Sequence, residues 1–281
     1  MSASGTAQQS GRGLIVKNGD LLVRSASAAI LLVVALGAAY LGGLAAGIVA
    51  ALFSFAVQYE WANVTGSGFG RTVPFAVAVA AAVVMTGGGL ATEAVVVVFI
   101  TTIAAGLFAR KLWLPAGIVY ASALGVGLVA LRVAPDYGFE ALVFLLGVVW
   151  TTDSGAFFAG RTFGGPKLWP AISPKKTWSG AIGGLAAAVA TGVLVAWISD
   201  VPVTIALVLV AIALSLSCQA GDLFESWVKR HFGAKDSGNL IPGHGGVMDR
   251  VDGLTFVAIM AVAIGMGHQG GGGLGRGLLI W

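Results

Sequence analysis

Long apolar runs separated by short polar breaks make up most of this 281-residue chain. Residues 25–59 contain no Asp, Glu, Lys or Arg, a length too great for one bilayer crossing of about 20 residues and sufficient for two short helices. Gly42 and Gly43 mark the expected turn between these two helices. The pattern predicts about nine membrane-spanning helices, over residues 25–41, 44–59, 73–86, 92–109, 114–133, 139–160, 179–198, 201–224 and 247–267.

Composition supports the same fold class. Hydrophobic residues account for 57% of the chain and charged residues for only 10%, which excludes an ordinary soluble domain. We therefore expect an all-α polytopic membrane protein with a single transmembrane domain over residues 25–267. The polar segment 1–24 is expected at the cytoplasmic side or the membrane surface, and the Gly-rich tail 268–281 is expected to be flexible over residues 269–277.

The distribution of basic residues predicts the orientation. With the N-terminus in the cytoplasm and nine crossings, all but Arg132 and Arg276 of the sixteen Lys and Arg residues lie on the cytoplasmic side, as the positive-inside rule requires. Reading residues 25–59 as one crossing leaves at best eleven on one side. We expect a multi-pass protein of the inner (cytoplasmic) membrane, with loops 161–178 and 229–246 both facing the cytoplasm.

The densest group of charges lies between the last two predicted crossings, over residues 225–252. It is preceded by Asp222, which with Glu225, Ser226 and Lys229 has the spacing i, i+3, i+4 and i+7 that places side chains on one stripe of a helix. Charges kept at a bilayer edge usually serve a site. The alternative is a structural Glu225–Lys229 salt bridge, with Asp222 facing a water-filled gap.

The last predicted helix begins with two carboxylates, Asp249 and Asp252, on one side. Acidic residues there are also favoured by the helix dipole, so capping is a serious alternative. The preceding Gly245 and Gly246 offer backbone N–H groups that can approach a phosphate closely. Carboxylates beside phosphates indicate Mg²⁺, which binds one or two carboxylates together with substrate oxygens. We expect Asp222 and Asp249 to hold it.

The loop before the seventh crossing adds cations. Lys175, Lys176 and Thr177 suit a polyphosphate, although a cytoplasmic loop would carry lysines in any case. Asp153 lies inside an apolar helix, where a carboxylate indicates a functional site. Cys218 has no evident partner base, so nucleophilic catalysis has no support. The pattern favours phosphoryl or nucleotidyl transfer by metal, lysine and backbone positioning.

These motifs resemble those of a known family. The segments 226–252, 173–180 and 153–157 are similar to the signatures of phosphatidate cytidylyltransferases, also called CDP-diacylglycerol synthases. The resemblance covers roughly the C-terminal half, and two positions depart from it: Phe157, where Tyr is frequent, and Ser179, where Glu or Gln is frequent. It implies an integral membrane enzyme that joins CTP to phosphatidic acid with Mg²⁺, releasing pyrophosphate.

Particular roles follow from the motifs and the resemblance together. The expected catalytic residues are Asp222, Asp249, Lys176 and Lys229, and the first two are the expected metal ligands. The expected substrate- and phosphate-binding residues are Asp153, Ser173, Lys175, Lys176, Thr177, Ser226, Lys229, Arg230, His244, Gly245, Gly246, Arg250 and Asp252. For His244, satisfying the turn is an equal alternative.

The expected reaction is an in-line attack by the phosphatidate oxygen on the α-phosphorus of CTP, without a covalent enzyme intermediate. Expected partners are CTP, phosphatidic acid and membrane lipids, with no nucleic acid, and a homodimer is left open. Two alternatives remain at this point. One is a CTP-dependent polyprenol kinase that takes the γ-phosphate, and the other is a non-enzymatic transporter, for which no internal repeat is seen.

Overall fold

The structure is a computed structural model that describes residues 29–30, 32–109, 112–241, 245–269 and 273–281. These residues form an all-α polytopic membrane fold with one short β-hairpin. Eight helices are long and apolar enough to cross a membrane. They are α2 (Gly43–Val64), α3 (Phe69–Gly87), α4 (Ala91–Ala109), α5 (Trp113–Arg132), α6 (Gly138–Phe163), α7 (Trp178–Ile198), α8 (Ile205–His231) and α9 (Met248–Gln269).

A shorter apolar helix, Leu32–Leu41, precedes α2. It agrees with the end of the first predicted crossing, whose start at residues 25–28 lies outside the described residues, as does the polar segment 1–24. The turn before α2 falls at Gly42 and Gly43, where both glycines have positive φ. The predicted division of the long uncharged run into two helices is therefore found in the described residues.

Two helices continue beyond their predicted ends. The prediction placed Glu60 in a polar break, but α2 runs on to Val64 because Glu60 and Trp61 are buried and have partners in other segments. Helix α8 continues to His231, so its charged stripe stays helical. The prediction ended both helices too early, because it took a polar side chain as a sign that the helix stops.

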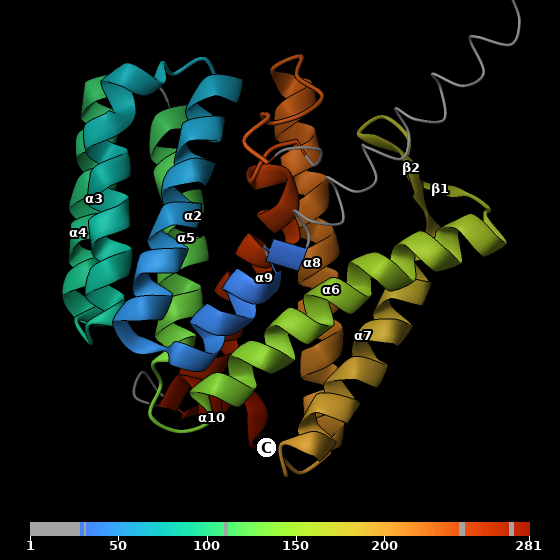
Figure 1. The fold of residues 1–281 in the computed structure, drawn as a ribbon. Coiled ribbons are helices and arrows are strands. Elements are labelled where there is room, and N and C mark those ends of the chain that lie inside the picture. Colours follow the sequence, from blue (N-terminus) through green and yellow to red (C-terminus); the bar gives the residue numbers. More distant parts are fainter. Residues whose placement is uncertain (1–28, 31, 110–111, 242–244, 270–272) are drawn as a thin grey trace, which may run out of the picture.

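The helices form two groups that meet at α8 and α9. Figure 1 shows α2 to α5 standing side by side, with α6 and α7 crossing obliquely on the other side of α8 and α9. Helices α6 and α7 pack closely because glycines face each other: a Cβ added at Gly184 would lie 2.6 Å from the carbonyl oxygen of Thr152. This is the close approach that small residues permit in lipid.

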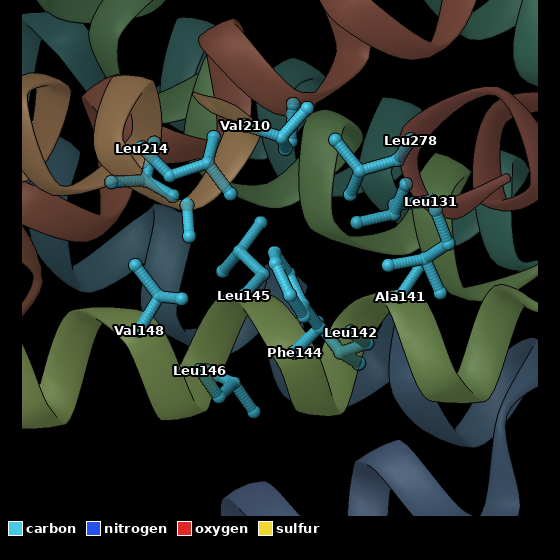
Figure 2. Packing of buried hydrophobic residues seen from close by; sticks show 14 of the residues in the cluster. Leu131, Ala141, Leu142, Phe144, Leu145, Leu146, Val148, Val210, Leu214 and Leu278 are labelled. Carbon is cyan, nitrogen blue, oxygen red and sulfur yellow. The ribbon is translucent and has the colours of Figure 1, made fainter. Parts of the chain in front are cut away.

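The largest apolar cluster joins α6 to α8, α9 and the C-terminal helix. Figure 2 shows Phe144 and Leu145 of α6 pointing toward Val210 and Leu214 of α8, with Leu278 nearby. Leu278 belongs to α10 (Leu274–Leu279), whose leucines are buried. The expectation of a flexible tail is therefore wrong for residues 273–277, because the leucines among the glycines provide an apolar face that packs against the bundle.

The cytoplasmic loop predicted between α6 and α7 contains a β-hairpin. Strand β1 (Lys167–Trp169) pairs antiparallel with β2 (Ser173–Thr177). The hairpin ends directly at α7, where the Thr177 hydroxyl accepts a hydrogen bond from the Gly180 N–H at 3.1 Å and so caps the helix. In Figure 1 the hairpin extends from the joined ends of α6 and α7, which fixes Lys175 and Lys176 to a regular element.

Candidate active site

A polar cavity of about 810 Å³ lies where α6, the hairpin, α7, α8 and α9 meet. Ionisable side chains of both signs line it in equal number. The acids are Asp153, Asp222, Asp236, Asp249 and Asp252, and the bases are Arg161, Lys175, Lys176, Lys229 and Arg250. The structure thus brings the two expected metal ligands, which are 27 residues apart in the chain, to one cavity.

Lys176 and Asp222 form an ion pair across this cavity. Lys176 lies in β2, and Asp222 lies in the C-terminal half of α8. Helix α8 is fixed nearby to α7, the helix that directly follows β2, since the Gln219 side-chain amide donates to the Ala181 carbonyl at 3.2 Å. The side chains of the pair are one quarter to one third exposed, so both remain accessible to a ligand from the cavity.

Lys229 is the centre of a second group of charges. Its ammonium lies 2.6 Å from the Glu225 carboxylate, one helical turn earlier, and 2.6 Å from the Asp249 carboxylate of α9. Glu225 is fully buried. The salt bridge considered as a structural alternative is therefore present, and the same lysine also reaches the second expected metal ligand. The Lys229 ammonium therefore pairs with carboxylates of both α8 and α9.

Asp249 also organises the turn in front of α9. Its Oδ2 accepts hydrogen bonds from the Ser237 N–H (3.1 Å), the Gly246 N–H (3.1 Å) and the Ser237 hydroxyl (2.9 Å). The Gly245 N–H donates to the Ile241 carbonyl at 3.1 Å. The two amides expected to approach a phosphate thus have partners within the chain, and the Gly246 amide serves the carboxylate instead.

The other expected site residues divide into two sets. Asp153, Lys175, Thr177, Arg250 and Asp252 line the cavity, although the Thr177 oxygen is already used as the α7 cap. Ser173, Ser226, Arg230, Gly245 and Gly246 are not among the lining residues. The Arg230 guanidinium donates to the Ala234 carbonyl at 3.1 Å. His244 lies outside the described residues.

Arg161 and Asp236 line the cavity without having been expected there, and two further residues beside the site were also missed in the sequence. Ser237 links the turn to Asp249, and Glu60 of α2 accepts hydrogen bonds from the start of α9. A signal for Glu60 existed, because it is the only acidic residue between positions 25 and 92 and a carboxylate flanked by apolar residues indicates a functional site. For Ser237 the signal was its position in segment 226–252, which resembles a family signature.

A second cavity adjoins the first. Its volume is about 600 Å³, and it lies between the Leu32–Leu41 helix, α2, α5, α6 and α9. Most of its lining is apolar, including Ala50, Leu128 and Leu146, whereas Asp153 and Arg250 line both cavities. A polar chamber and an apolar chamber therefore meet at one carboxylate and one guanidinium.

The polar cavity offers carboxylate oxygens to the expected Mg²⁺. Among the described residues no group of three or more His, Cys, Asp or Glu side chains forms a ready-made metal site. Mg²⁺ does not need one, since it binds one or two carboxylates together with phosphate oxygens and waters. Asp222 and Asp249 line one cavity and both are paired with lysine, so their oxygen donors fit a cation that arrives with a polyphosphate.

Comparison with known proteins agrees with this chemistry. Residues 22–266 match the model of the cytidylyltransferase family, and the chain belongs to that family. It is therefore a membrane-embedded nucleotidyltransferase, and the transporter alternative is excluded.

Individual relatives carry a more specific name. The phosphatidate cytidylyltransferase of Brucella suis biovar 1 (strain 1330) is 41% identical over 256 residues, covering 88% of this chain and 93% of the relative. The enzyme of the same name from Bacillus subtilis (strain 168) is 40% identical over 147 residues, covering 50% of this chain and 55% of the relative. The relatives thus bear the name of the family that the motifs resemble.

Proposed function

We propose that this protein transfers CMP from CTP to phosphatidic acid, which gives CDP-diacylglycerol and pyrophosphate for phospholipid synthesis. The observation that carries the proposal is the meeting of the two cavities at Asp153 and Arg250. A nucleotide triphosphate requires a polar chamber with cations, and a diacyl lipid requires an apolar one. The reacting phosphates of the two substrates would meet where the chambers join.

The equal numbers of acids and bases in the polar cavity support a metal–nucleotide complex as its ligand. A bare triphosphate would bring its negative charges close to five carboxylates, at a cost that the bases only partly offset. Carboxylates that held a divalent cation would no longer oppose the phosphates in this way. We assign Mg²⁺ to Asp222 and Asp249, where, when bound, it would polarise phosphate oxygens and neutralise charge on the leaving group.

The basic side chains bind and orient the two phosphate groups. Lys175 and Lys176 lie on a hairpin beside the cavity and Lys229 lies on α8, so they can hold the triphosphate from two sides. Arg250, at the junction, can orient the phosphatidate headgroup. A non-bridging oxygen of the phosphatidate phosphate then forms a new bond to the α-phosphorus, as the bond from that phosphorus to the oxygen bridging the α- and β-phosphates breaks. Pyrophosphate leaves with the electron pair of the broken bond.

We further propose that the site faces the cytoplasm from the inner membrane. The support is the excess of basic residues in the hairpin loop and in the loop between α8 and α9, which the positive-inside rule assigns to the cytoplasm. CTP is a water-soluble nucleotide, so it would reach the polar cavity from the cytoplasmic side. A homodimer stays a prediction, which the molar mass of the purified protein in detergent would test.

The decisive experiment uses labelled CTP with purified protein, Mg²⁺ and phosphatidate in detergent micelles. Label from the α-phosphorus in the lipid product supports the proposal, whereas label from the γ-phosphorus would support the kinase alternative. Asp249→Asn is expected to abolish product formation, because it removes a charge that faces both Lys229 and the cavity. Glu93→Gln is the matched control, since Glu93 is an exposed carboxylate in the first turn of α4.

A further inference from the structure

Glu60 connects α2 to the turn that holds Asp249. It is fully buried, and its two carboxylate oxygens accept from three donors far along the chain. Oε1 accepts from the Val247 N–H at 2.9 Å, and Oε2 accepts from the Met248 N–H at 2.7 Å and from the Ser237 hydroxyl at 3.0 Å. A buried carboxylate whose oxygens all have donors is a strong constraint on the position of those donors.

Two of the three donors, the N–H groups of Val247 and Met248, lie at the start of α9. The first N–H groups of a helix have no partner within it and carry a partial positive charge, so a carboxylate from another element stabilises them. Here Glu60 supplies that carboxylate from α2, and Asp249 follows Met248 directly in the chain. The position of Glu60 therefore determines where the first turn of α9 begins and where Asp249 lies.

Ser237 links the two carboxylates. Its hydroxyl is 3.0 Å from Glu60 Oε2 and 2.9 Å from Asp249 Oδ2, and its single proton can be donated to one of them at a time. The space around them is closely filled: a Cβ at Gly246 would lie 2.7 Å from Glu60 Oε2 and 2.9 Å from Asp249 Oδ2, and one at Gly238 would lie 2.7 Å from Glu60 Oε1.

We propose that Glu60 is a positioning residue for the transfer reaction, acting through Ser237 and the first turn of α9 to hold Asp249 and its Lys229 partner at the polar cavity. This inference rests on the proposed function. Glu60 is not among the residues that line the cavity, so its effect reaches the substrates only through Asp249. A side chain that merely stabilised the fold would leave the activity of each folded molecule unchanged.

Glu60→Gln is the informative substitution. Gln has nearly the same volume, but its amide nitrogen cannot accept from a backbone N–H, so one of the two α9 donors would face another donor. We expect the protein to fold and kcat per folded molecule to fall by about 10²-fold, the effect of a displacement of about 1 Å at a catalytic group. The KM values for CTP and phosphatidate should change little, since neither substrate touches Glu60.

Ser237→Ala tests the connection. If the effect passes through the Ser237 hydroxyl, the losses of kcat in Glu60→Gln and Ser237→Ala will not add in the double variant. Thr204→Ala is the matched control, because it removes a helix cap at the far end of α8, where the Thr204 hydroxyl accepts from the Leu207 N–H at 3.1 Å. It should lower the midpoint of thermal unfolding and leave kcat per folded molecule unchanged.

The outcomes separate this inference from the proposed function. An inactive wild-type protein would refute the proposed function itself. An active wild type together with an unchanged kcat per folded molecule in Glu60→Gln would overturn the positioning role. If Glu60→Gln does not give a monodisperse folded protein, Glu60→Asp, which keeps the charge but shortens the side chain, provides the test: reduced kcat supports the inference, and wild-type kcat refutes it.

Discussion

Lys176 of the hairpin pairs with Asp222 of α8, so a cation expected to hold phosphate lies directly beside a carboxylate expected to hold metal. The side chains remain partly exposed to the cavity. A metal–nucleotide complex would take over both partners, because Asp222 gains the cation and Lys176 gains the phosphate. The pair thus places side by side the two groups that would bind the two parts of such a complex.

This pairing predicts unequal effects of the two single substitutions. Asp222→Asn should lower kcat by about 10²-fold or more through loss of charge at the reacting phosphates, whereas Lys176→Met should chiefly raise the KM for CTP. The measurement is steady-state kinetics with CTP and phosphatidate varied in turn. Equal effects of both substitutions on KM alone, with kcat preserved, would contradict the assignment of Asp222 to the metal.

The pairing of Lys229 with Glu225 predicts a loss of stability that can be measured separately from activity. Lys229→Met leaves the buried Glu225 carboxylate without its cation, and breaking such a pair costs about 3–5 kcal/mol. Adding Glu225→Gln removes the uncompensated charge and should restore most of the lost thermal stability in detergent.

Activity should not return in that double variant, because Asp249 still lacks its lysine partner. The control is Glu225→Gln alone, which keeps Lys229 beside Asp249. Recovery of both stability and activity in the double variant would mean that Lys229 serves only to compensate Glu225.

The apolar cavity predicts a change in lipid use without a change in nucleotide use. Ala50→Trp would fill part of the space that Ala50 and Leu128 line, so the KM for long-chain phosphatidate should rise while the KM for CTP stays the same. Leu52→Trp is the matched control on the same helix, since Leu52 is 67% exposed and does not line the cavity. A similar rise in both variants would show that the cavity does not hold the acyl chains.

The burial of the C-terminal helix α10 predicts that a substitution there lowers stability, although it lies far from the proposed active site. Leu278 is fully buried against the α6–α8 cluster (Figure 2), so Leu278→Ala should destabilise the protein by about 2–5 kcal/mol, the range found for leucine truncation in a core. The thermal midpoint in detergent measures this, with Leu112→Ala as control because Leu112 is 85% exposed. Equal midpoints for the two variants would show that α10 contributes nothing to the fold.

Local features of the sequence were sufficient for the crossings and for the class of enzyme. A helix that spans a bilayer must be apolar over a fixed length, so the apolar runs alone predicted nine spans, of which the described residues contain eight long helices and the short helix Leu32–Leu41 of the remaining one. The ends differ by a few residues at most positions. The spacing of Asp222, Glu225 and Lys229 on α8 needed only helical periodicity, and the motif residues indicated a nucleotidyltransferase.

Only the tertiary structure decided which charged groups of different elements meet. Glu60 lies 187 residues from Val247, and the preference of a carboxylate for a helix start depends on a distance in space that no local pattern contains. From the sequence alone, the glycine amides of the turn could equally have faced a phosphate. In the folded chain they donate to Asp249 and Ile241 instead. Apolar length is a property of a segment, whereas the partner of a buried polar group is a property of the whole fold.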